Sequence, residues 1–293
     1  MKSKVGLALG GGGARGSYQI GVLKALDDAK VFKNIRHISG SSIGAINTLM
    51  ILGELSFDHM IDLWQSISND DLYGLNFERF KKDRLGMYSL DEMHERLLKE
   101  VPLTKIRKNK IQGFATAAKI NKDSLLEQIM IHHMEKTTFH LNKFSDPHRA
   151  VLASASIPVL FGSTTIDDTH YVDGGVIDNC PIQPLIDAGC DIIIAVPIDG
   201  RFHPKKFKKE DILLIDIETR KLFHTIPYDI LDFKPEVVKN KVEYGYQMGN
   251  MMIQKLIDLK YLNQRGSWNR PEGHTLISIT KDEEKKIIKE VNN

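Results

Sequence analysis

The sequence has few cysteines, no long apolar run and almost no net charge. Only two of its 293 residues are cysteines, Cys180 and Cys190, which are too few for a disulfide framework and lack the four-ligand grouping of a structural zinc site. We interpret them as reduced core thiols of a cytosolic protein. Because no uncharged apolar stretch approaches about 18 residues, we expect no segment that crosses a bilayer.

Positive and negative side chains nearly cancel. The 40 Lys and Arg residues against 38 Asp and Glu residues leave a net charge of +2, which gives no general electrostatic reason to bind nucleic acid. The apolar stretch Val5 to Leu9 near the N-terminus gives way to glycines and is too short for a secretory signal. We therefore expect a cytoplasmic protein without a nucleic-acid partner, which touches membranes at most peripherally.

The first 52 residues contain two strand, turn and helix units. Val5 to Leu9 leads into the glycine turn 10–13 and a helix, and the pattern repeats with a strand at 35–39, a turn at 40–44 and an apolar helix at 43–52. Such repetition predicts an α/β sheet. Further strands are expected at 111–120, 171–172, 191–196 and 212–217, and helices at 147–157 and 239–262.

Two other helical features follow from the residue pattern. Asp146 before Pro147 is typical of a helix start, with Asp as N-cap and Pro at the first helical position. Residues 56–100 are expected to form a helical cover over the sheet, with a polar connection at 69–71. Basic residues cluster after that connection, at Arg79, Lys81, Lys82 and Arg84.

The pentapeptide at 40–44 fits G-x-S-x-G, the turn that presents a nucleophilic serine between a strand and a helix. Gly40 and Gly44 flank Ser42 at the two positions where a side chain would not fit. Centring the motif on Ser41 would place Ser39 and Ile43 there instead. A small-residue turn without chemistry remains the alternative for an isolated match.

The glycine turn before the first helix has two possible uses. Gly11, Gly13 and Gly16 satisfy G-x-G-x-x-G, which can hold a pyrophosphate. That use also requires an Asp or Glu near the end of the second strand. Residues 36–39 at this place are Arg-His-Ile-Ser and include no acid. The other use is an oxyanion hole beside the serine turn, in which backbone N–H groups stabilise a tetrahedral intermediate.

A serine nucleophile needs a base. His203, His224 and His274 follow in the chain, but none lies in a tight glycine-flanked turn, and we interpret them as surface or helix residues. Asp173 comes between a predicted strand and Gly174-Gly175, a turn that lets a carboxylate project toward a neighbouring strand end. A turn-capping Asp without chemistry is the alternative. A catalytic Asp173 would need burial, since the pKa of a solvated Asp is near 3.9.

The segments 11–16, 40–44 and 173–175, in that order, resemble the signature of the patatin-like phospholipases. The similarity covers roughly residues 5–200 and extends to the segments 45–47, 153–158 and 179–181. It implies a three-layer α/β/α fold with a mainly parallel central sheet. Residues 1–200 would form the catalytic domain, and 201–293 a C-terminal extension packed on the same domain.

The resemblance also implies roles for individual residues. Ser42 would be the nucleophile and Asp173 the general base, without a histidine. Gly11, Gly12 and Gly13 would supply oxyanion N–H groups, and Arg15 would shape or polarise that loop. No metal or cofactor is implied, and the expected reaction is hydrolysis of phospholipid or lysophospholipid esters through an acyl-enzyme.

Three alternatives remain open at this point. The same Ser-Asp pair could serve an acyltransferase or a thioesterase, or the chain could be a lipid-binding protein without catalysis. A lysine-rich segment beside Phe202 and Phe207 is a candidate for contact with an anionic membrane, although a solvated loop is the simpler interpretation. Its lysines are Lys205, Lys206, Lys208 and Lys209. The oligomeric state cannot be deduced.

Overall fold

The computed structural model describes residues 3–66, 90–220, 230 and 232–291. Its sheet contains six mutually parallel strands, β1 (Val5–Leu9), β2 (Ile35–Ser41), β3 (Gln112–Ile120), β7 (Ile192–Val196), β8 (Leu213–Asp216) and β9 (Thr275–Ser278). Three antiparallel strands complete it, β4 (Glu135–His140), β5 (Thr164–Ile166) and β6 (Thr169–Asp173). The order is β5-β6-β3-β2-β1-β7-β8-β9, and β4 pairs with β3.

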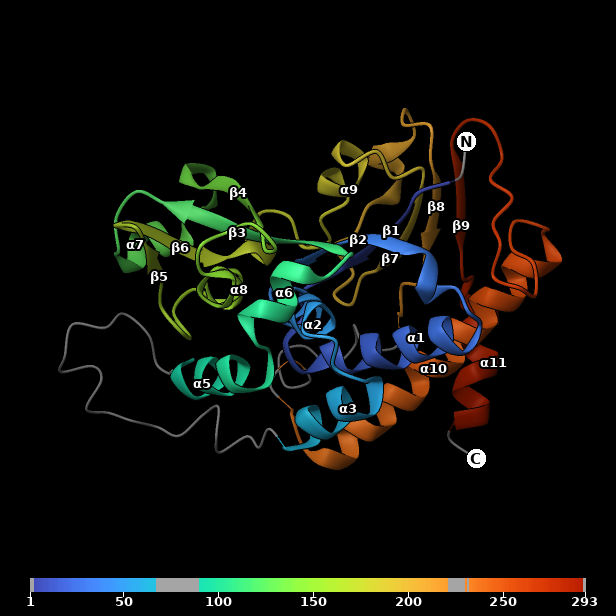
Figure 1. The fold of residues 1–293 in the computed structure, drawn as a ribbon, viewed down its shortest axis with the longest axis horizontal. Coiled ribbons are helices and arrows are strands. Elements are labelled where there is room, and N and C mark those ends of the chain that lie inside the picture. The colour runs from blue at the N-terminus through green and yellow to red at the C-terminus, as the bar shows by residue number, and fades with distance from the viewer. Residues whose placement is uncertain (1–2, 67–89, 221–229, 231, 292–293) are drawn as a thin grey trace.

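Helices cover both faces of this sheet (Figure 1). One layer contains α1 (Gly16–Asp28), α2 (Ile43–Leu52), α3 (Phe57–Ser66), α5 (Asp91–Glu100), α8 (Pro147–Ala155) and α10 (Pro235–Asp258). The short helix α9 (Gln183–Asp187) lies on the opposite side. The remaining helices are α6 (Leu103–Lys108), α7 (Leu125–Ile129) and α11 (Lys281–Val291). The expected three-layer α/β/α fold with a mainly parallel sheet is confirmed.

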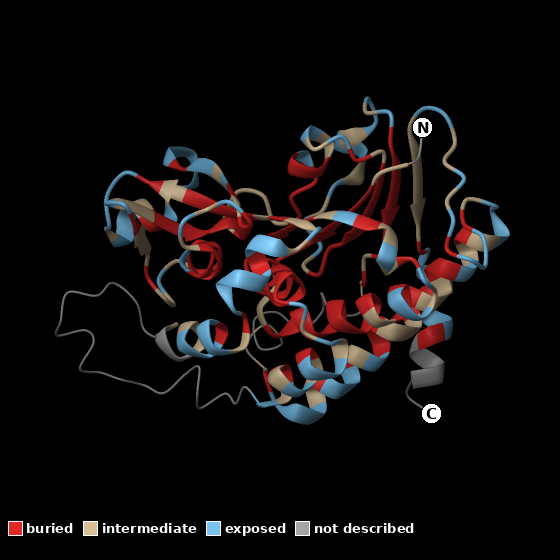
Figure 2. Ribbon diagram, in the orientation of Figure 1, coloured by how far each residue is buried: buried red, intermediate tan, exposed pale blue. Residues whose placement is uncertain are grey.

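The core lies between the sheet and the helix layers (Figure 2). All residues of β1, β7 and β8 are buried, as expected for parallel strands covered on both faces. The segment after residue 200 contributes β8 and β9 to the same sheet, and its long helix α10 packs along α1. Cys180 and Cys190 are buried free thiols.

Most predicted elements are confirmed, with local differences. The strand at 5–9 and the helix at 43–52 occur as predicted, and Asp146 caps α8 by accepting the Arg149 N–H at 2.9 Å. The long C-terminal helix begins four residues earlier than predicted, because Pro235 occupies its first turn. The predicted connection at 69–71 and the basic residues 79–84 lie outside the described residues. None of the described helices is both long and apolar enough to cross a membrane.

Candidate active site

The sheet brings the ends of β2 and β6 together. Both strands pair with the same edge of β3, because β4 occupies its other edge. The strand β2 runs parallel to β3 and ends with Ser41 opposite Thr116, whereas β6 runs antiparallel and ends with Asp173 opposite Ala117. The two strands therefore meet end to end, and the residues that follow or end them become neighbours.

Ser42 lies in a strained turn between β2 and α2. Its backbone has φ 54° and ψ −127°, a left-handed region that costs a non-glycine residue about 1–3 kcal/mol. Its N–H donates to Ser154 Oγ at 3.0 Å, and Ser154 Oγ donates to Thr116 O at 2.5 Å. A Cβ on Gly44 would lie 2.1 Å from Leu9 O. Close backbone packing thus excludes a side chain at Gly44 and holds the turn.

Ser42 and Asp173 form a buried hydrogen-bonded pair. Ser42 Oγ donates to Asp173 Oδ2 at 2.5 Å, and the Gly175 N–H donates to Asp173 Oδ1 at 2.6 Å. Asp173 is 5% exposed and Ser42 6%. Burial raises the pKa of Asp173 to about 6, against the lowering effect of these two hydrogen bonds. The carboxyl group is therefore a stronger base than an ordinary Asp and is ionised at neutral pH.

No histidine in the described part of the chain hydrogen-bonds to either member of this pair. His203 is exposed and His274 is half-buried, while His224 lies outside the described residues. Asp173 is thus the basic side chain in contact with Ser42.

The glycine turn lies beside Ser42 but differs in detail from the expected oxyanion loop. The Gly11 N–H donates to Asn179 O at 3.0 Å, so it is not available to an oxyanion and the expectation for Gly11 is not met. Gly12 and Gly13 follow, and Gly13 has φ 56° and lines the cavity at Ser42. Arg15 is fully buried, and its guanidinium donates to Ile198 O at 3.2 Å. Arg15 therefore fixes the loop to the segment after β7.

Asn179 also belongs to the site, although the sequence pointed to it only as a member of the segment 179–181 and predicted no role for it. Its Nδ2 donates to Gly11 O at 3.0 Å while its own carbonyl accepts the Gly11 N–H. A Cβ on Gly11 or on Gly175 would lie 2.5 or 2.4 Å from Asn179 Oδ1. The amide is thus wedged between the glycine loop and the turn that carries Asp173. Its position five residues after Gly174, in the turn that follows Asp173, is the only feature of the sequence that points to Asn179.

A buried amide network holds the same loop from the helix side. Gln19 Nε2 donates to Gly10 O at 2.8 Å, Asn47 Nδ2 donates to Gln19 Oε1 at 2.8 Å, and Trp64 Nε1 donates to Asn47 Oδ1 at 3.1 Å. Asn47 lies next to Thr48 in the mainly apolar helix α2. A polar amide within a mainly apolar helix was the signal available from the sequence.

Two adjoining cavities lined mainly by apolar side chains lie between the helices, and the first of them reaches Ser42. The first is lined by Ser42, Gly13, Ala155 and Phe161, among others. The second lies against Trp64 and Leu97 and extends to Arg96 and Glu100. Both share Ile43, Ile46 and Met93. The apolar walls beside the serine hydroxyl suit contact with an apolar group of a substrate.

The lysine-rich segment borders a separate cavity, which Lys206, Phe202 and Phe207 line together with Gly175 and Asn179. Lys205, Lys206, Lys208 and Lys209 are exposed, whereas Phe202 and Phe207 are half-buried against a core cluster of their own. The two rings stack on each other with centroids 6.4 Å apart. The aromatic residues therefore face the protein, which fits the solvated-loop interpretation.

A serine turn, a buried acid and a glycine loop meet at the strand ends in the middle of the sheet, next to an apolar cavity, as in a serine ester hydrolase. The chain matches the family model described as patatin-like phospholipase over residues 7–186. It therefore belongs to the patatin-like phospholipase family.

Individual relatives agree with this assignment. The chain is 26% identical over 293 residues to a probable lipid hydrolase of Invertebrate iridescent virus 6, covering 98% of this chain and 89% of that protein. It is 28% identical over 207 residues to a lysophospholipase of Yarrowia lipolytica, covering 66% of this chain but only 12% of that protein's length. Human GIVD cytosolic phospholipase A2 has a similar fold, with a TM-score of 0.51 and 11% identity over 88% of this chain and 59% of that chain.

Proposed function

We propose that this protein is a lipid acyl hydrolase that cleaves carboxylic esters of phospholipids or lysophospholipids. The observation that carries the proposal is the 2.5 Å hydrogen bond from Ser42 Oγ to the buried Asp173 carboxylate. Family membership and the apolar cavities at Ser42 support a fatty-acyl substrate.

In the first half-reaction, Ser42 Oγ attacks the ester carbonyl carbon while its proton passes to Asp173 Oδ2. The tetrahedral intermediate then collapses, the bond to the leaving oxygen breaks, and Asp173 returns the proton to the departing alcohol. In the second half-reaction, a water molecule attacks the acyl-enzyme and loses its proton to Asp173. The bond to Ser42 Oγ then breaks, and the protonated serine and a fatty acid result.

Charge on the carbonyl oxygen develops next to the glycine loop. The N–H groups of Gly12 and Gly13 are the loop donors that we assign to this oxygen, because the Gly11 N–H is used by Asn179. The N-terminus of α2, which begins directly after Ser42, adds the positive end of a helix dipole. One well-placed donor of this kind contributes roughly 100- to 1000-fold in rate.

The decisive experiment is an activity panel with Ser42→Ala as the control. Wild-type protein should release fatty acid from a lysophospholipid, and Ser42→Ala should lose at least about a thousandfold of that activity. Parallel assays with a triglyceride and an acyl-thioester, with and without an alcohol acceptor, would reveal a thioesterase or an acyltransferase. Equal fatty-acid release by both proteins would refute the assignment of Ser42, and lipid binding without any cleavage would favour a non-catalytic protein.

A further inference from the structure

Exposed apolar side chains concentrate at one place, the helix α7 and the turn after it. Leu126 is 62% exposed, Ile129 61%, Ile131 51% and Leu125 49%. Val159, at 38%, lies next to them in the loop between α8 and β5. We call these five residues the α7 ridge. Exposed apolar side chains scattered singly are ordinary, but a contiguous group indicates an interaction surface.

The polarity of α7 is inverted relative to an ordinary surface helix. Ser124 caps the helix by accepting the Glu127 N–H at 3.2 Å. Gln128, which is 1% exposed, faces the protein, and its Oε1 accepts the Val159 N–H at 3.0 Å. The polar side chain thus anchors the helix while the leucine and isoleucine side chains face outward. Incomplete packing does not account for this orientation, since a specific buried hydrogen bond maintains it.

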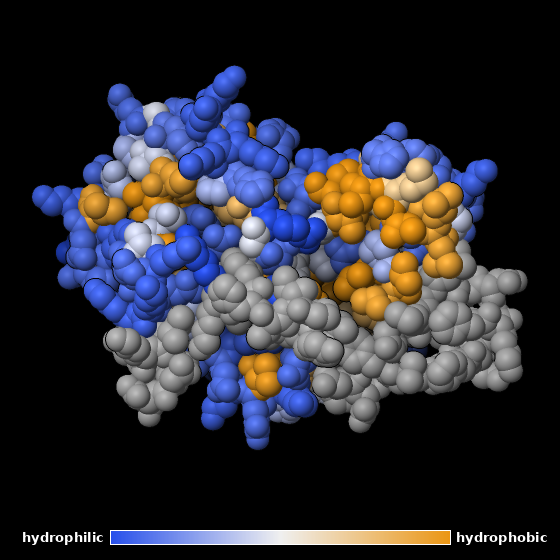
Figure 3. Space-filling model, turned by 180° about the vertical axis from the view of Figure 1, so that it is seen from behind, coloured by the Kyte–Doolittle hydropathy of each residue, from blue (hydrophilic) through white to orange (hydrophobic). Residues whose placement is uncertain are grey.

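The α7 ridge adjoins the entrance of the cavity at Ser42. Val159 lies two residues after Ile157 and two before Phe161, and both of these line the cavity. Val159 has φ 67°, an unusual conformation for a β-branched residue, and its side chain remains partly exposed. Figure 3 shows hydrophobic surface gathered on the half of the molecule that carries α7 and β5, as the comparison with Figure 1 indicates.

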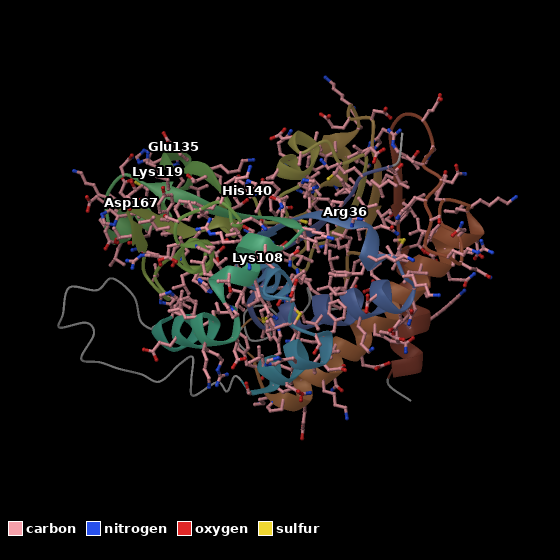
Figure 4. The ribbon with its side chains drawn as sticks, viewed as in Figure 1. Arg36, Lys108, Lys119, Glu135, His140 and Asp167 are labelled. Carbon is pink, nitrogen blue, oxygen red and sulfur yellow. The ribbon has the colours of Figure 1, made fainter. Side chains whose placement is uncertain are left out.

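Charged side chains of both signs lie near the ridge. Lys119 pairs with Glu135 at 3.3 Å, and His133 lies 3.4 Å from Glu127. Figure 4 shows Lys119, Glu135 and Asp167 at the end of the molecule where Figure 1 places α7. A polar rim of mixed charge around an apolar group fits a surface whose attraction is apolar and not ionic.

We propose that the α7 ridge inserts into the surface of a lipid bilayer and holds the Ser42 cavity against it. This inference rests on the proposed function, because a lipid substrate has to pass from its bilayer into the cavity. We choose a bilayer as the partner because the ridge adjoins the cavity that would take the acyl chain. The mixed charge around the ridge gives no reason to expect a strongly charged partner. The ridge replaces the lysine segment at 205–209, whose aromatic residues face the protein, as the membrane contact.

The test is co-sedimentation of full-length Ser42→Ala protein with phosphatidylcholine vesicles, so that binding is measured without turnover. The variant Leu126→Ser/Ile129→Ser should bind at least about tenfold more weakly, since each side chain loses its share of apolar burial in the lipid. The double variant Leu103→Ser/Leu259→Ser removes two exposed leucines elsewhere, at 41% and 44% exposure, and should bind like the parent.

An activity assay separates failure of the ridge from failure of the proposed function. With Ser42 restored, both double variants should hydrolyse a water-soluble short-chain ester within twofold of wild type. If wild type itself does not hydrolyse this ester, the proposed function is contradicted and the role of the ridge is not. Unchanged vesicle binding by Leu126→Ser/Ile129→Ser would overturn the inference. So would binding that requires anionic lipid and disappears when the four lysines are neutralised, or a dimer that becomes monomeric only in this variant.

Discussion

Asn179 and Gly11 exchange two hydrogen bonds, from the Gly11 N–H to Asn179 O and from Asn179 Nδ2 to Gly11 O, each 3.0 Å long. These bonds join the glycine loop after β1 to the segment after Asp173. The Asn179 amide therefore helps to set the position of the glycine loop relative to Asp173, together with the hydrogen bonds of Arg15 and Gln19. Asn179 is a positioning residue in the proposed mechanism, because it acts on the loop and not on the substrate.

Replacing Asn179 should lower kcat more than it changes KM. Asn179→Ala removes the bond to Gly11 O and should reduce kcat on a short-chain ester by about ten- to a hundredfold, as expected when an oxyanion donor is displaced. Asn179→Asp keeps the size but faces Gly11 O with a carboxylate, so its kcat should be lower still. Steady-state kinetics and a thermal melt of each variant check this, and a rise in KM alone would contradict it.

Asp173→Asn should abolish activity and stabilise the fold at neutral pH. Burial raises the pKa of Asp173 from its usual 3.8 to about 6, so the folded protein binds this proton more tightly than the unfolded chain. The stability from the protonated carboxyl is fully present below about pH 4 and is lost as the pH rises through 6, up to about 3 kcal/mol. Urea unfolding should show a larger gain for Asp173→Asn at pH 8 than at pH 5.

The rate of ester cleavage should fall in acid as Asp173 becomes protonated. We expect kcat/KM on a soluble ester to decrease below a pH of about 6, the pKa of this carboxyl. A second buried acid, Asp216, has its pKa raised to about 7, mainly by burial, and serves as a control. The Asp216→Asn variant should show the same fall of kcat/KM in acid as wild type. If the fall disappears in this variant, it is caused by Asp216 and not by Asp173.

Gly44→Ala should be far more damaging than a glycine substitution in open space. A Cβ at Gly44 would lie 2.1 Å from Leu9 O, and the fixed backbone of β1 cannot move away, so we expect a loss of at least about 3 kcal/mol. Gly189 has φ 78° but no atom within 4 Å of a Cβ, so Gly189→Ala should cost only about 1–2 kcal/mol. Chemical denaturation of both variants measures the difference.

Ile46→Phe should shorten the acyl chain that the enzyme accepts. Ile46 lines both apolar cavities and is 5% exposed, so a larger side chain there takes up space beside Ser42. Activity on esters of long fatty acids should fall by about tenfold or more relative to short ones. A chain-length series from butyrate to palmitate tests this, and a uniform decrease across the series would indicate damage to the dyad instead.

Much of the fold follows from local sequence. Short apolar runs such as Val5 to Leu9, each followed by glycines and an apolar helix, require burial on both faces and so predict parallel strands under helices. The glycines at 40 and 44 identify the serine turn by their spacing around Ser42, although the contact that excludes a side chain at Gly44 comes from Leu9 in another strand. The strands β4, β5 and β9 were not predicted, since their half-exposed, mixed patterns resemble loops.

The sequence by itself determined which residues could be the nucleophile and the acid, because each needs a tight turn that glycine marks. Only the tertiary structure decided that they meet, since β2 and β6 approach each other end to end along one edge of β3 from positions 131 residues apart. The tertiary structure also decided which N–H groups of the glycine loop are left to bind an oxyanion. The Gly11 N–H is already bonded to the carbonyl oxygen of Asn179, which is far away in the sequence. Hydrogen bonds between distant segments have no local pattern, so they become visible only in the folded chain.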